Sequence, residues 1–101
     1  MVRHVVLCKF RTSVSEEQCA NAINALRTLG QSISEVREWS IGKQALPSST
    51  AYDLAIVSGF ENVEALERYR NHPDHIRTKN LLTEIADLAV VDYEYSLEQE
   101  G

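Results

Sequence analysis

Residues 3–10 read Arg-His-Val-Val-Leu-Cys-Lys-Phe, an alternation that predicts a β-strand with two apolar faces. Successive side chains of a strand point to opposite faces of its sheet. One face therefore carries His4, Val6, Cys8 and Phe10, and the other carries Val5, Leu7 and Lys9. Because both faces are largely apolar, we expect both to be covered by other parts of the protein.

A helix follows this strand. Ser15 begins it, because Gln18 three residues later completes a capping box, and Gly30 predicts its end. The apolar residues between them recur at helical spacing and are Cys19, Ala22, Ile23, Leu26 and Leu29. Residues 36–43 and 51–60 predict two further strands. The Pro-containing segment 44–50 between these strands predicts a loop, which we expect to border a ligand entrance.

The last part of the chain predicts a broken helix and a final strand. Asn62 caps a short helix, and His72-Pro73 ends it because a residue before proline avoids helical dihedrals. Pro73 suits the first position of the next helix, which runs to about residue 86 before a strand at 88–95. The side chains expected to face inward are Val63, Leu66, Tyr69, Ile76, Leu82, Ile85 and Leu88.

This order of elements predicts an α+β protein. A ferredoxin-like split β-α-β protomer would place four antiparallel strands in one sheet with the helices on one face. The opposite face should then be polar, yet it carries Val5, Leu7, Ala55 and Val57. A second copy of the chain is the simplest cover for such a surface, so we expect a homodimer formed through the sheet faces.

Composition excludes several classes of function. The chain has 101 residues, 44% of them hydrophobic, and a formal net charge of -5. We therefore expect a single domain at residues 1–96 with a short polar tail at 97–101, and no binding of nucleic acid or membrane. Cys8 and Cys19 make neither a disulfide framework nor a metal set, and no signal peptide is visible, which predicts a cytoplasmic protein. No phosphate-binding loop is present, so no nucleotide cofactor is expected.

Five blocks of the sequence resemble the stress-responsive dimeric α/β-barrel (Dabb) family. They are residues 3–10, 36–43, 52–55, 72–75 and 91–93, and the most specific is His72-Pro73-Asp74-His75. The resemblance covers Met1 to about Tyr95. It implies a ferredoxin-like protomer whose sheet packs against that of a second copy to form a dimeric α/β barrel.

The resemblance also implies candidate site residues. The family includes olivetolic acid cyclase, a polyketide cyclase that works without a cofactor and uses a tyrosine and a histidine. The matching residues here are Tyr69 and His75, with His4 and Asp92 at two further matching positions. The first helix of that cyclase contributes aromatic side chains to its pocket. This chain has Ala22, Ile23 and Leu26 instead, so the resemblance does not extend to a long aromatic-lined tunnel.

The chemistry of these residues has two interpretations. His75 would be the third residue of its helix, where the helix dipole disfavours a charged imidazole and favours a general base. The phenol of Tyr69 can donate to a carbonyl oxygen that is gaining charge. The structural interpretation is that His72 or His75 caps the helix and Tyr69 fills the core. Asp92 can orient His4 or His75, or can bind backbone or water.

A metal site made by His4, His72 and His75 is disfavoured, because Pro73 should turn His72 away. We expect the cavity between helices and sheet to bind a small organic molecule, with Val6, Ile23, Leu26 and Ile56 also lining it. An enzyme with this site would perform cofactor-free cyclisation or isomerisation of a carbonyl compound. The alternative is a non-catalytic stress-responsive or assembly module. An open cavity reaching Tyr69 and His75 would favour the first function, and a space filled by side chains would favour the second.

Overall fold

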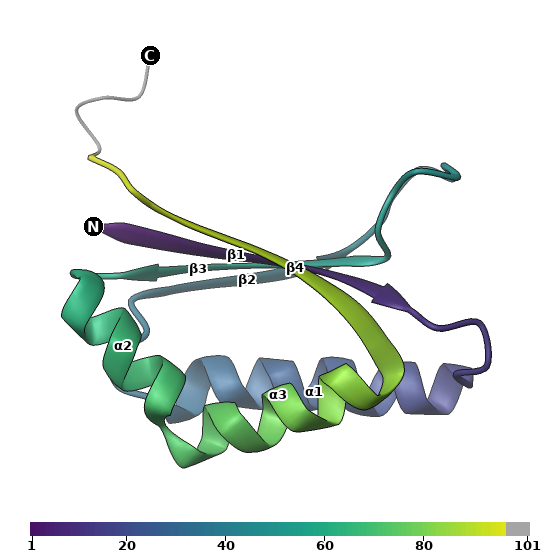
Figure 1. Ribbon diagram of the computed structural model, residues 1–101, viewed down its shortest axis with the longest axis horizontal. Coiled ribbons are helices and arrows are strands. Elements are labelled where there is room, and N and C mark those ends of the chain that lie inside the picture. Colours follow the sequence, from purple (N-terminus) through teal and green to yellow (C-terminus); the bar gives the residue numbers. More distant parts are fainter. Residues whose placement is uncertain (97–101) are drawn as a thin grey trace.

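Four antiparallel strands form one sheet, and three helices cover one of its faces (Figure 1). The structure is a computed structural model that describes residues 1–96, so the predicted tail at 97–101 lies outside the described residues. The strands are β1 (Val2–Phe10), β2 (Glu38–Lys43), β3 (Leu54–Phe60) and β4 (Ala86–Glu94). The helices are α1 (Glu16–Ser32), α2 (Val63–Asn71) and α3 (Pro73–Ile85).

The strand order β2-β3-β1-β4 confirms the predicted ferredoxin-like α+β fold. Strand β1 lies in the interior of the sheet and pairs with β3 and with β4. Its register places His4 opposite Asp92 on β4 and Val5 opposite Val57 on β3. Two predicted site residues from opposite ends of the chain are thereby neighbours on the sheet.

Helix α1 begins as predicted but ends later. Ser15 Oγ accepts a hydrogen bond from the Gln18 amide at 3.1 Å, and Gln18 Oε1 accepts one from the Ser15 amide at 2.9 Å. The predicted end at Gly30 is wrong, because the helix continues to Ser32. Gly30 serves a packing role instead: a Cβ atom there would lie 2.4 Å from ring carbons of Trp39. The glycine lets the Trp39 indole pack directly on the helix backbone.

The break between α2 and α3 lies where His72-Pro73 predicted it. His72 has an extended backbone, with φ -67° and ψ 136°, and Pro73 is the first residue of α3. The ring of His72 caps α3, since its Nδ1 accepts a hydrogen bond from the Asp74 amide at 3.0 Å. The sequence allowed either His72 or His75 to cap this helix, and in the structure His72 is the cap.

Most of the predicted inward residues are buried, and two are not. Leu66, Tyr69, Leu82 and Ile85 are buried, and Leu88 packs against the core. Val63 is 45% exposed and Ile76 is 46% exposed. Val63 is the first residue of α2, and Ala65 takes its place inside. The inner face of α3 is carried by residues 75, 78, 82 and 85, and Ile76 lies outside that stripe because each residue turns the helix by about 100°.

Apolar side chains remain open on the outer face of the sheet. Val91 and Tyr93 are 56% and 44% exposed, and Val5, Leu7, Ala55 and Val57 are half-buried in the single chain. The helix side of the sheet holds the core, around Phe60 and Leu66 at one end and around Cys8 and Leu54 at the other. Among residues 1–96, no helix is both long enough and apolar enough to span a membrane.

Candidate functional site

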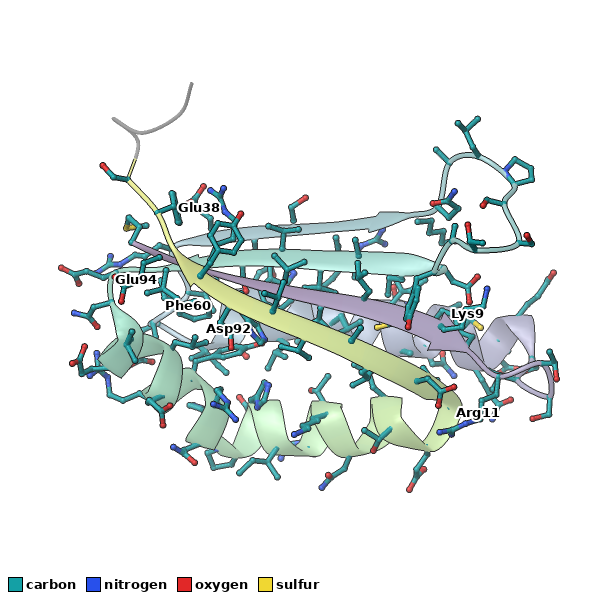
Figure 2. All side chains as sticks on the ribbon, turned by 45° about the horizontal axis from the view of Figure 1, so that its top comes forward. Lys9, Arg11, Glu38, Phe60, Asp92 and Glu94 are labelled. Atoms are coloured by element: carbon teal, nitrogen blue, oxygen red, sulfur yellow. The ribbon has the colours of Figure 1, made fainter. Side chains whose placement is uncertain are left out.

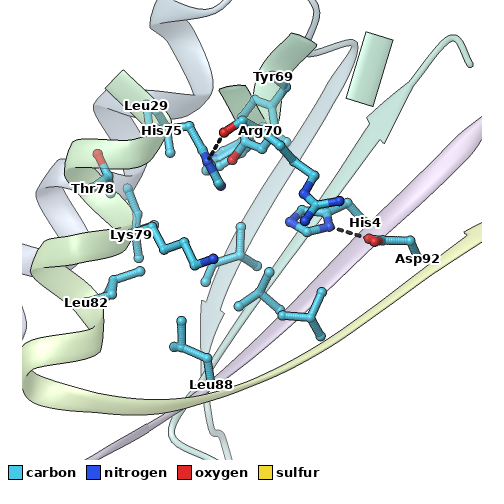
Figure 3. Close-up of a pocket in the computed structure, with 15 residues that line it drawn as sticks. His4, Leu29, Tyr69, Arg70, His75, Thr78, Lys79, Leu82, Leu88 and Asp92 are labelled. Atoms are coloured by element: carbon cyan, nitrogen blue, oxygen red, sulfur yellow. Dashed lines mark hydrogen bonds and ion pairs between the residues drawn. The ribbon is translucent and has the colours of Figure 1, made fainter. Parts of the chain in front are cut away.

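A cavity of about 210 Å³ lies between the helix side of the sheet and helices α2 and α3 (Figure 3). The predicted site residues that line it are His4, Val6, Leu26, Ile56, Tyr69, His75 and Asp92. Ile23 does not line it and belongs to the hydrophobic core. Ile23 lies about one turn before Leu26 on α1, at the end that borders a different hollow.

The loop at 44–50 does not border this cavity, contrary to the expectation from sequence. Figure 2 shows Asp92 on the helix side of β4, far along the sheet from Lys9 and Arg11. Segment 44–50 connects the ends of β2 and β3 at the Lys9 end, because Lys9 Nζ donates to the Ala51 carbonyl at 2.9 Å. The loop and the cavity therefore lie at opposite ends of the sheet.

His75 is held in one defined protonation state. It is the third residue of α3, and its Nδ1 donates a hydrogen bond to the backbone carbonyl of Arg70 at 3.0 Å. A carbonyl oxygen only accepts, so Nδ1 carries the proton and Nε2 keeps its lone pair. Burial lowers the pKa of His75. The hydrogen bond to the Arg70 carbonyl raises the pKa in part, and the charges of His4, Lys79 and Arg70 lower it further. The ring is therefore neutral at pH 7 with a basic nitrogen free.

The ring of Tyr69 lies close to the rings of both site histidines. Its side chain is 3% exposed, and its ring centroid is 4.6 Å from that of His75 and 6.0 Å from that of His4. Burial raises the pKa of Tyr69 well above the ordinary phenol value, so the hydroxyl keeps its proton and can donate it. Within residues 1–96 the hydroxyl has no hydrogen-bond partner. The donor is therefore free for a ligand.

Asp92 orients His4 rather than His75. His4 Nδ1 and an Asp92 carboxylate oxygen form a hydrogen bond. The pair follows from the β1–β4 register, which places the two residues directly opposite each other. A carboxylate on Nδ1 fixes the orientation of the imidazole, so His4 presents a second defined ring beside Tyr69.

His72 lies outside this group, because its ring is used to cap α3. Among the described residues, no three His, Cys, Asp or Glu side chains are grouped so that they could hold a metal ion. Of the three histidines, His4 and His75 therefore line the cavity, and His72 lies at the break between α2 and α3.

Eight further residues line the cavity that the sequence alone did not predict to be in the site. They are Leu29, Trp39, Arg70, Thr78, Lys79, Leu82, Leu88 and Val90. Thr78 and Lys79 follow His75 by three and four residues, a spacing that places side chains on the same helix face. That spacing is the signal that could have found them. The indole nitrogen of Trp39 is buried without a hydrogen-bond partner among residues 1–96.

The fold and the cavity together define a small ferredoxin-like domain with an imidazole–phenol pocket between sheet and helices. The chain belongs to the Stress responsive A/B Barrel Domain (Dabb) family, whose sequence profile matches residues 2–95. An uncharacterized protein of Streptomyces coelicolor is 35% identical over 97 residues, which are 94% of this chain and all of that protein.

Solved structures show the same fold. A dimeric ferredoxin-like protein of unknown function from Bacteroides fragilis is 31% identical, with a TM-score of 0.77 over 93% of this chain and 95% of that one. A hydroxynitrile lyase from Passiflora edulis is 20% identical, with a TM-score of 0.86 over 95% of this chain and 94% of that one. The latter likeness establishes the fold and assigns no activity to this chain.

Proposed function

We propose that the chain is a homodimer whose cavity binds a small organic carbonyl compound and transfers a proton on it without a cofactor. The observation that carries the proposal is the pairing of a free donor with a free base in one cavity. The phenol of Tyr69 has no partner, and the ring of His75, 4.6 Å away between centroids, has a neutral and free Nε2. Perturbed titratable groups in a cavity are typical of functional sites.

The proposed reaction begins with removal of a proton from the carbon beside the carbonyl group. His75 Nε2 takes this proton, and the electron pair of the C–H bond moves onto the carbonyl oxygen to form an enolate. Tyr69 stabilises that oxygen by donating a hydrogen bond. In a β,γ-unsaturated carbonyl compound the resulting dienolate takes the proton back from His75 at its γ carbon, which is isomerisation. In a compound with two carbonyl groups the enolate carbon instead attacks the second carbonyl carbon, and the alkoxide formed there takes the proton from His75, which is aldol cyclisation.

The alternative is a non-catalytic stress-responsive or assembly module. That function predicts a space filled by side chains behind Tyr69 and His75. The cavity of about 210 Å³ that Tyr69 and His75 line supports a ligand-binding role instead. The hydroxynitrile lyase from Passiflora edulis supports only the general point that this fold can belong to an enzyme.

The homodimer is supported by the apolar outer face of the sheet and by the relative from Bacteroides fragilis, which is described as dimeric. We propose that the two sheets pack face to face as a dimeric α/β barrel, covering Val5, Leu7, Ala55 and Val57. A reduced, cytoplasmic location is supported by the free thiols of Cys8 and Cys19.

Exchange of carbon-bound hydrogen in deuterium oxide tests the proposed reaction. Small ketones and 1,3-diketones should exchange the hydrogens beside the carbonyl faster with the protein than in buffer, as followed by proton NMR. Replacing His75 with alanine should lower the rate enhancement by about 10²-fold or more. His72→Asn is the matched control, because asparagine also caps helices and His72 lies outside the cavity. Exchange at the buffer rate for every compound tested would refute the proposed function.

A further inference from the structure

Two cations line the cavity of an otherwise acidic protein. The chain has 10 basic and 15 acidic residues, yet Arg70 and Lys79 line the cavity with Asp92 as its only carboxylate. Asp92 is already bonded to His4. The side chain of Lys79 extends from α3 into the cavity (Figure 3). The cavity thus has unmatched positive charge at the point where a ligand would lie.

Lys79 is the cation without a partner. Arg70 lies 3.6 Å from Glu67 on its own helix, and Arg77 is paired with Asp74 on α3. Within the part of the chain that the structure describes, no carboxylate lies within ion-pair distance of the exposed Lys79 side chain. Although it is exposed, this lysine also lines the cavity beside the proposed base, with an apolar stem that can lie along the cavity wall.

The position of Lys79 sets how far a negative group of the ligand, bound to Lys79, lies from the carbon that reacts at His75. Lys79 follows His75 by four residues, so the two side chains leave the same face of α3 about 6 Å apart. A negative group on the ligand should therefore lie only a few bonds from the carbon that His75 deprotonates. A cavity of about 150 Å³ holds a molecule the size of benzene, so about 210 Å³ suits a ligand of roughly six to ten heavy atoms.

A carboxylate fits this site better than a phosphate. Phosphate groups favour several converging donors, such as free amides at a helix N-terminus. At the start of α3 the Asp74 amide is already bonded to His72 Nδ1. A single lysine ammonium at the rim of a mostly apolar cavity is sufficient for a carboxylate.

We propose that the ligand is a small oxo-carboxylate, with its carboxylate paired to Lys79 at the rim and its ketone oxygen at the Tyr69 hydroxyl. This inference rests on the proposed function and narrows its substrate class. Lys79 is a binding residue in this arrangement, and His75 and Tyr69 keep their roles in proton transfer.

Three ligands of nearly equal size test the carboxylate site at Lys79 separately from the carbonyl site at Tyr69. They are 4-oxopentanoate, its uncharged analogue 4-oxopentanamide, and pentanoate, which lacks the ketone. Trp39 is the only tryptophan and lines the cavity, so its fluorescence reports binding to the intact homodimer. At low salt we expect 4-oxopentanoate to bind at least tenfold more tightly than each of the other two.

Substitution of Lys79 gives the decisive comparison. Lys79→Gln should remove the advantage of 4-oxopentanoate over 4-oxopentanamide and leave the affinity for the amide unchanged. The matched control is Lys43→Gln, because Lys43 is another exposed lysine that lines a different hollow. Both side chains are exposed, and equal melting temperatures would establish that both variants are folded.

The outcomes distinguish this inference from the function on which it rests. Equal affinity for the acid and the amide, or an unchanged preference in Lys79→Gln, overturns the carboxylate site alone. Pentanoate that binds as tightly as 4-oxopentanoate, with the Lys79 dependence intact, refutes the carbonyl site and leaves the carboxylate site standing. Absence of binding by all three ligands at millimolar concentration overturns both.

Discussion

Replacing Gly30 with alanine should destabilise this protein, although the same change in an exposed helix normally stabilises it. Alanine improves helix propensity over glycine by about 1 kcal/mol. Here the added Cβ would lie 2.4 Å from two ring carbons of Trp39, which is far inside van der Waals contact. Overpacking of this kind costs about 1–3 kcal/mol. We expect a net loss of about 1 kcal/mol in the free energy of unfolding, and a melting temperature lower by about 4–8 °C.

Thermal unfolding in two backgrounds tests this reasoning. With Trp39 present, Gly30→Ala should lower the Tm and shift the tryptophan emission, because the indole must move. In a Trp39→Leu background the clash partner is gone, so the same glycine replacement should be neutral or stabilising. The difference between the two backgrounds measures the Gly30–Trp39 coupling. An equal change of Tm in both backgrounds would refute the assignment of Gly30 to a packing role.

Three further predictions concern the interface and the site. Val57→Lys places a charge on the apolar outer face and should convert the dimer to monomer in light scattering; a stable dimer would contradict the sheet-on-sheet interface. Tyr69→Phe removes a hydroxyl without a partner, so the free energy of unfolding should change by less than about 0.5 kcal/mol while proton exchange falls by about 10²-fold; a large loss of stability would point to a structural role. Burial lowers the pKa of His75 below about 6.5, its value in an unfolded chain, so the unfolded state binds more protons just below that pH. The free energy of unfolding should therefore fall as the pH drops below about 6.5. In a series of urea denaturations at different pH values, this free energy should depend less on pH in His75→Gln than in the unchanged protein. An equal pH dependence in both would disprove the prediction.

The features that the sequence predicted well depend on local rules. The capping box at Ser15 and the helix break at His72-Pro73 are each set by residues a few positions apart. The strand alternation of residues 3–10 correctly placed His4 on the helix side, where it is 6% exposed. The sequence alone predicts the wrong role for Gly30, because its packing partner, Trp39, is brought near only by the tertiary fold.

The site was predictable where it follows from the sheet and less so on the helices. The β1–β4 pairing brings Asp92 to His4, and a ferredoxin-like order already implies that these strands are adjacent. Lys79 was missed because an isolated lysine on an amphipathic helix is typical of a solvent-facing surface. Ile23 is expected in the site on the resemblance, because the first helix of the similar cyclase contributes pocket side chains. The resemblance does not say how far along this helix the cavity of the present chain extends, and the cavity does not reach Ile23.

The break between α2 and α3 explains how the site can be built from so few residues. In a continuous helix the Asp74 amide would donate to the Arg70 carbonyl. The helix break at Pro73 separates these two groups, and each forms a hydrogen bond with a histidine ring instead. His72 Nδ1 accepts from the Asp74 amide, and His75 Nδ1 donates to the Arg70 carbonyl. One lost backbone hydrogen bond is thus replaced by two imidazole bonds of opposite polarity. Because the carbonyl can only accept, the same replacement fixes the His75 proton on Nδ1 and frees Nε2 as a base. The structural and the catalytic interpretations of the His-Pro-Asp-His block are therefore compatible, with capping assigned to His72 and the proposed proton transfer to His75.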